Sequence, residues 1–195
     1  IAISGEPGPV FIEIPTEIQM FKGEVKHIQT YKKSYQNPEF DQQKLEAAAG
    51  ILTRAKNPGI YVGWGAAGAS EEIVRIAELL GAPVCTTLQG KATFPASHPL
   101  HTGFGFGPNA VPASQEAFKN CDAMLAVGVR FSEIGTGSYG VKVPENLIHI
   151  DINSKVFNKN YPSKISVEAD AKEALGSLAK ILENSKTQKN SSQLK

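Results

Sequence analysis

The sequence has no long apolar run and no excess of charge of either sign. None of its apolar runs approaches the roughly 18 residues that a membrane-spanning helix needs. Twenty Lys and Arg against nineteen Asp and Glu leave a net charge of +1. The electrostatic attraction that drives binding to nucleic acid or to an anionic membrane is therefore absent. We expect neither a nucleic-acid partner nor a membrane partner.

Cysteine is scarce, and the common catalytic and metal-binding motifs are missing. The two cysteines, Cys85 and Cys121, lie in apolar, strand-like segments, which is typical of reduced core residues in a cytoplasmic protein. His98 and His101 have no carboxylate or thiol close in sequence, so we expect no metal site there. No nucleophile elbow, P-loop lysine or Cys/His constellation is present. The residues alone indicate no catalytic group.

The start of the chain does not resemble the start of a domain. It begins with Ile1 and shows no charged leader followed by a cleavage site, so we expect it to begin inside a longer protein, although processing would give the same start. Val10 to Ile14 is a strand-like run stopped by Pro15. Because a single strand needs a sheet, we expect this run to pack on a second copy, to join an edge strand, or to be disordered.

The rest of the chain alternates between strand-like and helical segments. Strands are expected at 60–62, 83–87, 122–129, 146–150 and 164–167, helices from about 40 to 56 and over 70–80, 112–119 and 170–183, and a loop from 88 to about 109. Short links between them indicate a doubly wound, mostly parallel α/β sheet of the Rossmann-like class, with helices on both faces. We divide the chain into a terminal segment of a preceding domain (1–20), a linker (21–39), the main domain (40–183) and a polar, frayed tail (184–195).

Apolar spacing predicts which side of each helix is buried. The expected inward positions are Leu45, Ala48, Ala49 and Leu52 in the first helix, Ile73, Val74, Ala77 and Leu80 in the second, and Ala174, Leu178 and Ile181 in the last.

The glycine-rich loops are expected to share one edge of the sheet. Ligands of such sheets bind at the carboxyl ends of the strands, and the loops that follow the strands there are 63–69, 87–91, 102–109, 130–140 and 151–156. This coincidence indicates a nucleotide-like ligand.

Two readings remain open for the first of these loops. Gly63-x-Gly65-x-x-Gly68 follows a strand and opens a helix, as in dinucleotide-binding proteins. The fingerprint also needs an acidic residue about 20 positions later, where this chain has Thr86 and Thr87. Ordinary NAD binding is thereby weakened, and a tight turn without a ligand is the alternative.

Other loop residues also allow two interpretations. The alternating Gly103 to Gly107 segment either approaches a flat ring system or forms a mobile loop. Arg130 is either a phosphate partner or half of an ion pair with Glu133 or Asp151. His149, inside a strand, is expected to be packed or hydrogen-bonded rather than catalytic.

Several segments together resemble thiamine-diphosphate-dependent enzymes of the acetolactate synthase group, over about residues 5 to 183. The segments that carry the resemblance, in the family's order, are Gly8-Pro9-Val10-Phe11-Ile12-Glu13-Ile14-Pro15, Thr86-Thr87-Leu88-x-Gly90-Lys91 with Phe94-Pro95 and His98-Pro99, Gly128-Val129-Arg130-Phe131 with Gly135-Thr136-Gly137, and His149-Ile150-Asp151-Ile152-Asn153 with Asn158-Lys159-Asn160. The first segment resembles the end of the pyrimidine-binding domain, and the others resemble the central domain.

The resemblance implies a six-stranded, largely structural central domain that lies between two thiamine-diphosphate-binding domains. It implies a 2-keto acid decarboxylase or carboligase, a lyase or transferase, that works as a homo-oligomer (dimer or tetramer). Thiamine diphosphate and Mg²⁺ would be held by the flanking domains, with the activating glutamate upstream of Ile1 and the metal motif downstream of Lys195. The chain itself would be inactive.

The resemblance also implies an FAD site in many members. The family pattern places its contacts on Gly63, Gly65, Thr87, Leu88, Gly128, Arg130, Asp151, Ile152, Asp170 and Ala171. The sequence departs from the flavin-binding pattern at Trp64 and at Ser132-Glu133-Ile134.

Two rival hypotheses belong to other classes. A freestanding FAD- or NAD-binding α/β module would bind its cofactor tightly as the isolated chain. A purely structural interaction domain would bind no ligand and form a defined dimer.

Overall fold

The chain divides into two units, Ile1–Asn37 and Pro38–Lys195, and each is described by itself. The structure is a computed structural model that describes residues 2–3, 6–24, 26–28, 30 and 37–193, with side chains described up to residue 185. Part of the expected linker, residues 25, 29 and 31–36, lies outside the described residues.

The described residues of the first unit include one short helix. α1 (Thr16–Met20) buries no residue. The strand-like run Val10 to Ile14 forms no strand in the described part of this unit, and Phe11 and Ile12 are 86% and 75% exposed. The sheet partner that this run needs to become a strand remains a prediction.

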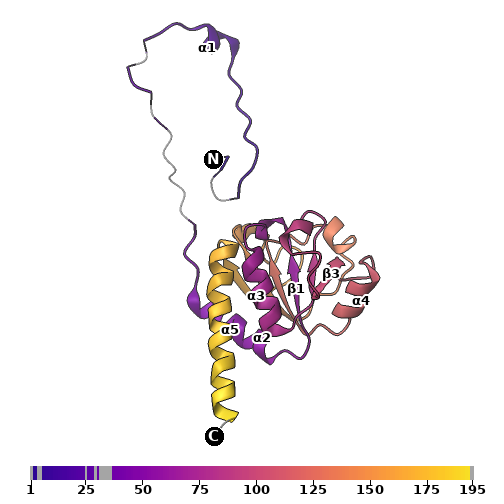
Figure 1. Ribbon diagram of the computed structural model, residues 1–195. Helices are drawn as coiled ribbons and strands as arrows, with labels where there is room; N and C mark the ends of the chain where they lie inside the picture. The colour runs from indigo at the N-terminus through magenta and orange to yellow at the C-terminus, as the bar shows by residue number, and fades with distance from the viewer. Residues whose placement is uncertain (1, 4–5, 25, 29, 31–36, 194–195) are drawn as a thin grey trace. The chain divides into compact units, whose positions relative to one another are not determined.

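The second unit is built on one parallel sheet of six strands (Figure 1). The strands are β1 (Pro58–Val62), β2 (Val84–Thr86), β3 (His101–Phe104), β4 (Ala123–Val127), β5 (Asn146–Asp151) and β6 (Ile165–Glu168). Their order is β3-β2-β1-β4-β5-β6, and every neighbouring pair is parallel. The predicted doubly wound α/β class is thereby confirmed. The direction of winding reverses between β1 and β4, and a crevice at such a switch point is the usual ligand site.

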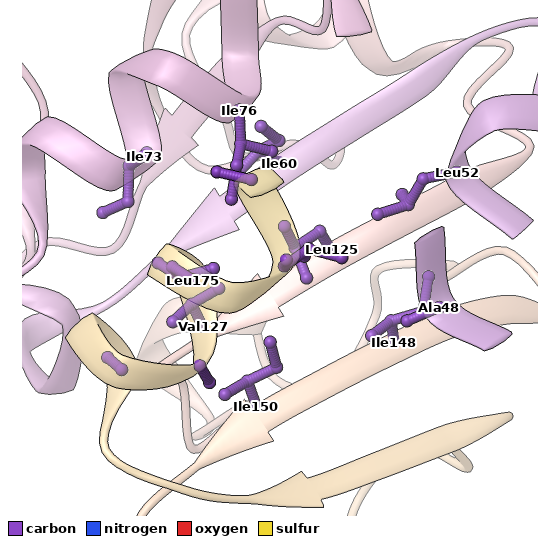
Figure 2. Packing of buried hydrophobic residues seen from close by; sticks show 14 of the residues in the cluster. Ala48, Leu52, Ile60, Ile73, Ile76, Leu125, Val127, Ile148, Ile150 and Leu175 are labelled. Atoms are coloured by element: carbon purple, nitrogen blue, oxygen red, sulfur yellow. The ribbon is translucent and has the colours of Figure 1, made fainter. Parts of the chain in front are cut away.

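One face of the sheet packs against three helices. These are α2 (Gln42–Arg54), α3 (Ser70–Leu80) and α5 (Ala171–Gln193). Figure 2 shows their apolar side chains meeting those of the central strands, with Ile76 of α3 near Ile60 and Leu175 of α5 near Val127. Burial of these apolar surfaces is the main favourable term in folding.

The other face is covered by a shorter helix and by loops. α4 (Pro112–Phe118) packs there through Phe118, and Phe106, Phe131 and Val141 arrive from loops. The strands alternate accordingly, since Tyr61, Met124 and Leu147 point to this face while their sequence neighbours point to the first.

Local signals explain where the helices begin and end. Asp41 accepts hydrogen bonds from the N–H groups of Gln43 and Lys44 and so caps α2. Gly81 ends α3 in the left-handed conformation at φ 62°. Asp170 accepts from the N–H groups of Lys172 and Glu173 at the start of α5.

The structure corrects three of the sequence predictions. The expected loop 88–109 contains the edge strand β3. The sequence did not predict this strand because its four residues are half-buried and form no apolar run. α5 continues to Gln193 through the expected frayed tail. The inward residues also differ: Ile76 is buried on α3 while Val74 and Leu80 are half-buried, and on α5 Leu175, Ala179 and Leu182 are buried while Ile181 is half-buried.

Among the described residues, no helix combines the length and the apolar character needed to cross a bilayer.

Candidate functional site

The loops at the carboxyl edge of the sheet are tied together by backbone hydrogen bonds. The first residue beyond a strand donates its N–H to the neighbouring strand: Gly105 to Thr86, Thr87 to Val62, Gly63 to Val127 and Gly128 to Ile150, at donor–acceptor distances of 2.9–3.0 Å. Ala169 likewise donates to Asp151 at 3.0 Å. The ladder therefore extends past the strands and fixes the start of each loop.

At the switch point, the loops after β1 and β4 touch through glycine. A Cβ atom on Gly63 would collide with the carbonyl oxygen of Gly128, and one on Gly128 would lie 2.5 Å from the backbone nitrogen of Ala66. Gly65 donates its N–H to the Gly128 oxygen at 3.3 Å. Gly128 also adopts φ 60°, which favours glycine. The absence of a side chain at these glycines allows the two loops to pack closely.

The turn between β1 and α3 presents an indole to solvent. It forms the short 3₁₀ helix η1 (Trp64–Ala66), and Trp64 is 66% exposed. Glu71 and Glu72 lie in the first turn of α3, and their charges disfavour an anion at this helix N-terminus. Any phosphate at this edge therefore needs another partner.

The loop after β2 is closed by the Thr87 hydroxyl. Its Oγ1 accepts the N–H of Gly90 at 2.9 Å. Gly90 is buried against Gly63, since a Cβ there would lie 2.9 Å from the Gly63 Cα. Leu88, which lies between Thr87 and Gly90 in sequence, is 48% exposed at the rim.

Arg130 and Asp151 bring opposite charges to the edge. Burial raises the pKa of Asp151, while the N–H of Asn153, the charge of Arg130 and the N–H of Ile152 act in the other direction. Asp151 Oδ1 accepts the Asn153 N–H at 2.9 Å. The Arg130 side chain is exposed, so the guanidinium is accessible at the rim. Of the two ion-pair partners considered from sequence, the structure brings Asp151 into electrostatic range.

The residue after Arg130 is held in an unusual backbone conformation. Phe131 has φ 48° although it is bulky, and its side chain is buried. Its ring packs edge-on against His149, with centroids 5.3 Å apart, and Asn160 donates to its carbonyl at 3.0 Å. Packing on both sides thus fixes the backbone that carries Arg130.

His149 is buried behind the rim, as predicted. Its Nε2–H donates to the carbonyl of Val129 at 2.7 Å. Burial lowers its pKa to about 4, and the bond to Val129 acts in the opposite direction. The neutral ring therefore packs between Phe131 and Phe157 as a structural group.

Sequence reasoning missed two groups that organise this edge. The hydroxyl of Tyr61, inside β1, donates to the carbonyl of Gly135 at 3.0 Å and anchors the loop after β4. Ser114 on α4 is buried and donates to the carbonyl of Gly105, which holds the loop after β3. An isolated Tyr or Ser carries no pattern in sequence that marks such a role.

The two cysteines are both free. Cys85 is fully buried in β2, and burial raises its pKa well above its usual value. Cys121 is half-buried in the turn before β4, outside the strand segment, and burial raises its pKa to about 12. Both thiols are therefore protonated and packed.

The ten residues that the resemblance singled out lie at the carboxyl ends of five strands. They are Gly63 and Gly65 after β1, Thr87 and Leu88 after β2, Gly128 and Arg130 after β4, Asp151 and Ile152 at β5, and Asp170 and Ala171 after β6. Some of them have structural roles: the backbones of Gly63 and Gly128 pack against each other, and Asp170 caps α5. Within the described part of the chain, no three His, Cys, Asp or Glu residues are grouped to hold a metal.

Comparison with known proteins points in one direction. Residues 45–178 match the sequence model of the family "thiamine pyrophosphate enzyme, central domain". The chain is 37% identical over 194 residues to a probable acetolactate synthase large subunit of Methanocaldococcus jannaschii, covering 93% of this chain and 32% of that protein. It is 34% identical to the acetolactate synthase large subunit of Corynebacterium glutamicum, covering 97% of this chain and 30% of that protein.

A plant protein gives a similar result. The chloroplastic acetolactate synthase of Arabidopsis thaliana is 33% identical, over 94% of this chain and 28% of that protein. The chain thus spans about a third of the length of these curated relatives. Because the family match covers more than half of the chain and the observed sheet has the expected six strands, this chain belongs to the central-domain family of thiamine pyrophosphate enzymes.

Proposed function

We propose that this chain is the scaffold domain of a thiamine pyrophosphate-dependent enzyme that decarboxylates a 2-keto acid and passes the product to an acceptor. The observation that carries the proposal is the family match over residues 45–178. The similarity to acetolactate synthases over nearly the whole chain supports it. In this proposal the chain alone is inactive.

We propose a division of the chain that the family match over residues 45–178 supports in its central part. Residues 1–20 are the end of a pyrimidine-binding domain, 21–39 a linker, 40–183 the central domain and 184–195 a polar tail. The exposed apolar side chains of Phe11 and Ile12 support a missing sheet partner. The flanking domains bind thiamine pyrophosphate and Mg²⁺, and the complete enzyme is a cytoplasmic homodimer or homotetramer.

Thiamine pyrophosphate, when bound, supplies the electron sink for cleaving the bond next to the keto group. In this proposal the flanking domains, and not residues 40–183, hold it. The domain's contribution is instead to position its neighbours and to form part of the oligomer.

We further propose that the carboxyl edge of the sheet holds FAD. The chemistry of the rim fits a dinucleotide: Arg130 offers a cation for the diphosphate. Asp151 and Asp170 bring carboxylate oxygens to the same edge, and such oxygens can accept from a ribose hydroxyl. The residues that would hold the cofactor are Gly63, Gly65, Thr87, Leu88, Gly128, Arg130, Asp151, Ile152, Asp170 and Ala171.

The N–H groups of the rim glycines contribute little in this arrangement. Gly63, Gly65 and Gly128 each donate their N–H to another loop or strand. The diphosphate therefore depends on Arg130 and on side chains more than on a backbone cradle. This is a physical reason to expect modest affinity for FAD.

The proposal is tested by expressing the complete reading frame beside the 195-residue chain. Both are assayed for pyruvate consumption with thiamine pyrophosphate and Mg²⁺, and FAD binding is measured by calorimetry. We expect turnover and FAD binding by the complete protein, no turnover by the 195-residue chain, and weak FAD binding by it. Turnover by the 195-residue chain contradicts the scaffold role, and failure of the complete protein to bind FAD contradicts the flavin site.

A second candidate is a freestanding FAD- or NAD-binding module. It is favoured by one observation, that residues 38–195 form a unit of their own with the complete six-stranded sheet. It predicts tight binding of one of these cofactors by the 195-residue chain. The same calorimetry separates the two candidates.

A further inference from the structure

The exposed large apolar side chains of the second unit gather at one edge. Among its described side chains, residues 38–185, the most exposed of these are Trp64, Leu88, Val111, Ile134 and Tyr139. All five lie in segments that follow the carboxyl ends of β1, β2, β3 and β4. Scattered exposed apolar residues are ordinary, but a group confined to one edge marks a binding surface.

The backbone at Trp64 is held on both sides. Gly63 before it is locked to Val127 and Gly128, and Gly65 after it donates to Gly128. The Trp64 carbonyl itself accepts the N–H of Ala67 at 3.0 Å. A rigid backbone that presents a two-thirds exposed indole loses little entropy when that ring is covered.

The loop that touches the Trp64 turn carries Arg130, whose charge a ligand with both an aromatic ring and a phosphate would use. Trp64 follows β1 and Arg130 follows β4, so the two lie on either side of the switch point, and their loops touch at Gly128. The indole face suits a flat ring, and the guanidinium suits a diphosphate. The acidic first turn of α3 steers the anion away from that helix and toward Arg130.

We propose that Trp64 is the ring-binding residue of this edge, and that its indole stacks on a flat ring of the bound FAD. The proposal rests on the flavin site proposed above and adds a residue outside the family pattern. Both the adenine and the isoalloxazine ring offer the required face. The test therefore uses ligands that carry only one of them.

Trp64 is the single tryptophan of the chain, so its indole N–H gives one isolated signal in a proton–nitrogen correlation spectrum. The isotope-labelled 195-residue chain is titrated with FAD, with ADP and with FMN, and the indole signal is followed beside the amide signals of Gly128 and Arg130. We expect the indole signal to move with FAD in a saturable way by the ring current of the stacked ring. Movement with ADP alone assigns the adenine ring, and movement with FMN alone assigns the isoalloxazine ring.

Affinity provides the second readout, measured by calorimetry on the complete protein. Loss of one stacking partner weakens binding of a base on the order of tenfold, which we expect for Trp64→Ala. Trp64→Phe keeps a ring and is expected to stay within about threefold of the parent protein. Lys180→Ala removes an exposed side chain of α5 that belongs neither to this group nor to the proposed FAD contacts, and it serves as the control, with unchanged affinity.

The outcomes separate this inference from the flavin proposal. Saturable movement of the Gly128 and Arg130 amide signals with an immobile indole signal overturns the stacking role and leaves the flavin site standing. FAD binding by the complete protein that is as tight in Trp64→Ala as in the parent does the same. Tighter binding by Trp64→Ala also overturns it and makes the indole an obstruction. No FAD binding by any variant overturns both proposals.

Discussion

The backbones of Gly63 and Gly128 lie so close that neither residue has room for a side chain. A Cβ on Gly63 would overlap the carbonyl oxygen of Gly128, and a Cβ on Gly128 would press on Gly65 and Ala66. These two positions join the halves of the sheet where its winding reverses. The contact holds the loops of the candidate site in register with one another.

Alanine at either position is therefore expected to destabilise the fold. Overpacking of this kind costs about 1 to 3 kcal/mol of unfolding free energy, and Gly128→Ala adds strain from its positive φ. Urea unfolding followed by circular dichroism measures the loss. Gly68→Ala is the matched control, because nothing lies within 4 Å of a Cβ there; equal stability of all three variants contradicts the contact.

The buried, neutral His149 makes stability depend on pH. Its pKa is about 4 in the folded state against 6.5 as the ordinary value, so the unfolded chain binds the extra proton between these two values. Unfolding free energy should then fall as pH drops from about 6.5 to about 4, by roughly 3 kcal/mol in total at 1.36 kcal/mol per pKa unit.

Melting curves across this pH window check the effect. His149→Gln keeps a donor for the Val129 carbonyl but does not titrate. We expect its stability to vary less with pH than that of the parent, even if its absolute stability is lower. An identical pH slope in the two proteins excludes His149 as the cause.

Asp122 clamps the opposite, amino-terminal edge of the sheet. Its two carboxylate oxygens accept the N–H groups of Lys56 and Asn57, each at 2.9 Å, and these bonds lower its pKa. Asp122→Ala leaves both donors without this partner and should lower the melting temperature by roughly 2 to 4 °C. Glu116→Ala, which removes only an exposed ion pair with Lys119, should change it less.

The lowered pKa of Asp122 also predicts how the stability changes at acid pH. Because the folded pKa of Asp122 is lowered, the stability it contributes is present above its ordinary pKa of 3.8 and is lost as pH falls below that value. A parent protein and Asp122→Ala that converge in stability at acid pH agree with this account.

Arg130 and Asp151 should be coupled in the absence of any ligand. The charge of Arg130 lowers the pKa of Asp151, which burial raises. Arg130→Gln is expected to raise the pKa of Asp151 further, as measured by nuclear magnetic resonance titration of its carboxyl carbon. Lys180→Gln, on the exposed side of α5, should leave this pKa unchanged.

The strands and helices with strong apolar patterns could be predicted from the sequence. The run in β4 is buried at every position, and Asp41 and Gly81 mark helix ends through side-chain and backbone chemistry that operates locally. The weak edge strand β3 could not be predicted, because its residues are half-buried and its pairing with β2 shifts register between Val84 and Cys85. Its position follows from contacts made across the sheet.

The position of the candidate site could be predicted from the sequence, but the roles of its individual residues could not. A parallel sheet brings the loops after Val62 and Val127 to one edge, so the grouping follows from the fold class. The use of glycine there does not follow from the motif, since Gly63 and Gly128 meet each other in the structure. The roles of Tyr61 and Ser114 depend on partners far away in sequence.

The prolines that flank Val10 to Ile14 have a consequence for handling the chain. Pro9 and Pro15 lack the amide hydrogen that interchain β-pairing requires. They limit any β-pairing between molecules to the five residues 10–14, and in the in-register parallel pairing the Glu13 side chains of two molecules face each other as like charges. Concentrated preparations should therefore form reversible clusters, dispersed by low ionic strength, rather than fibrils.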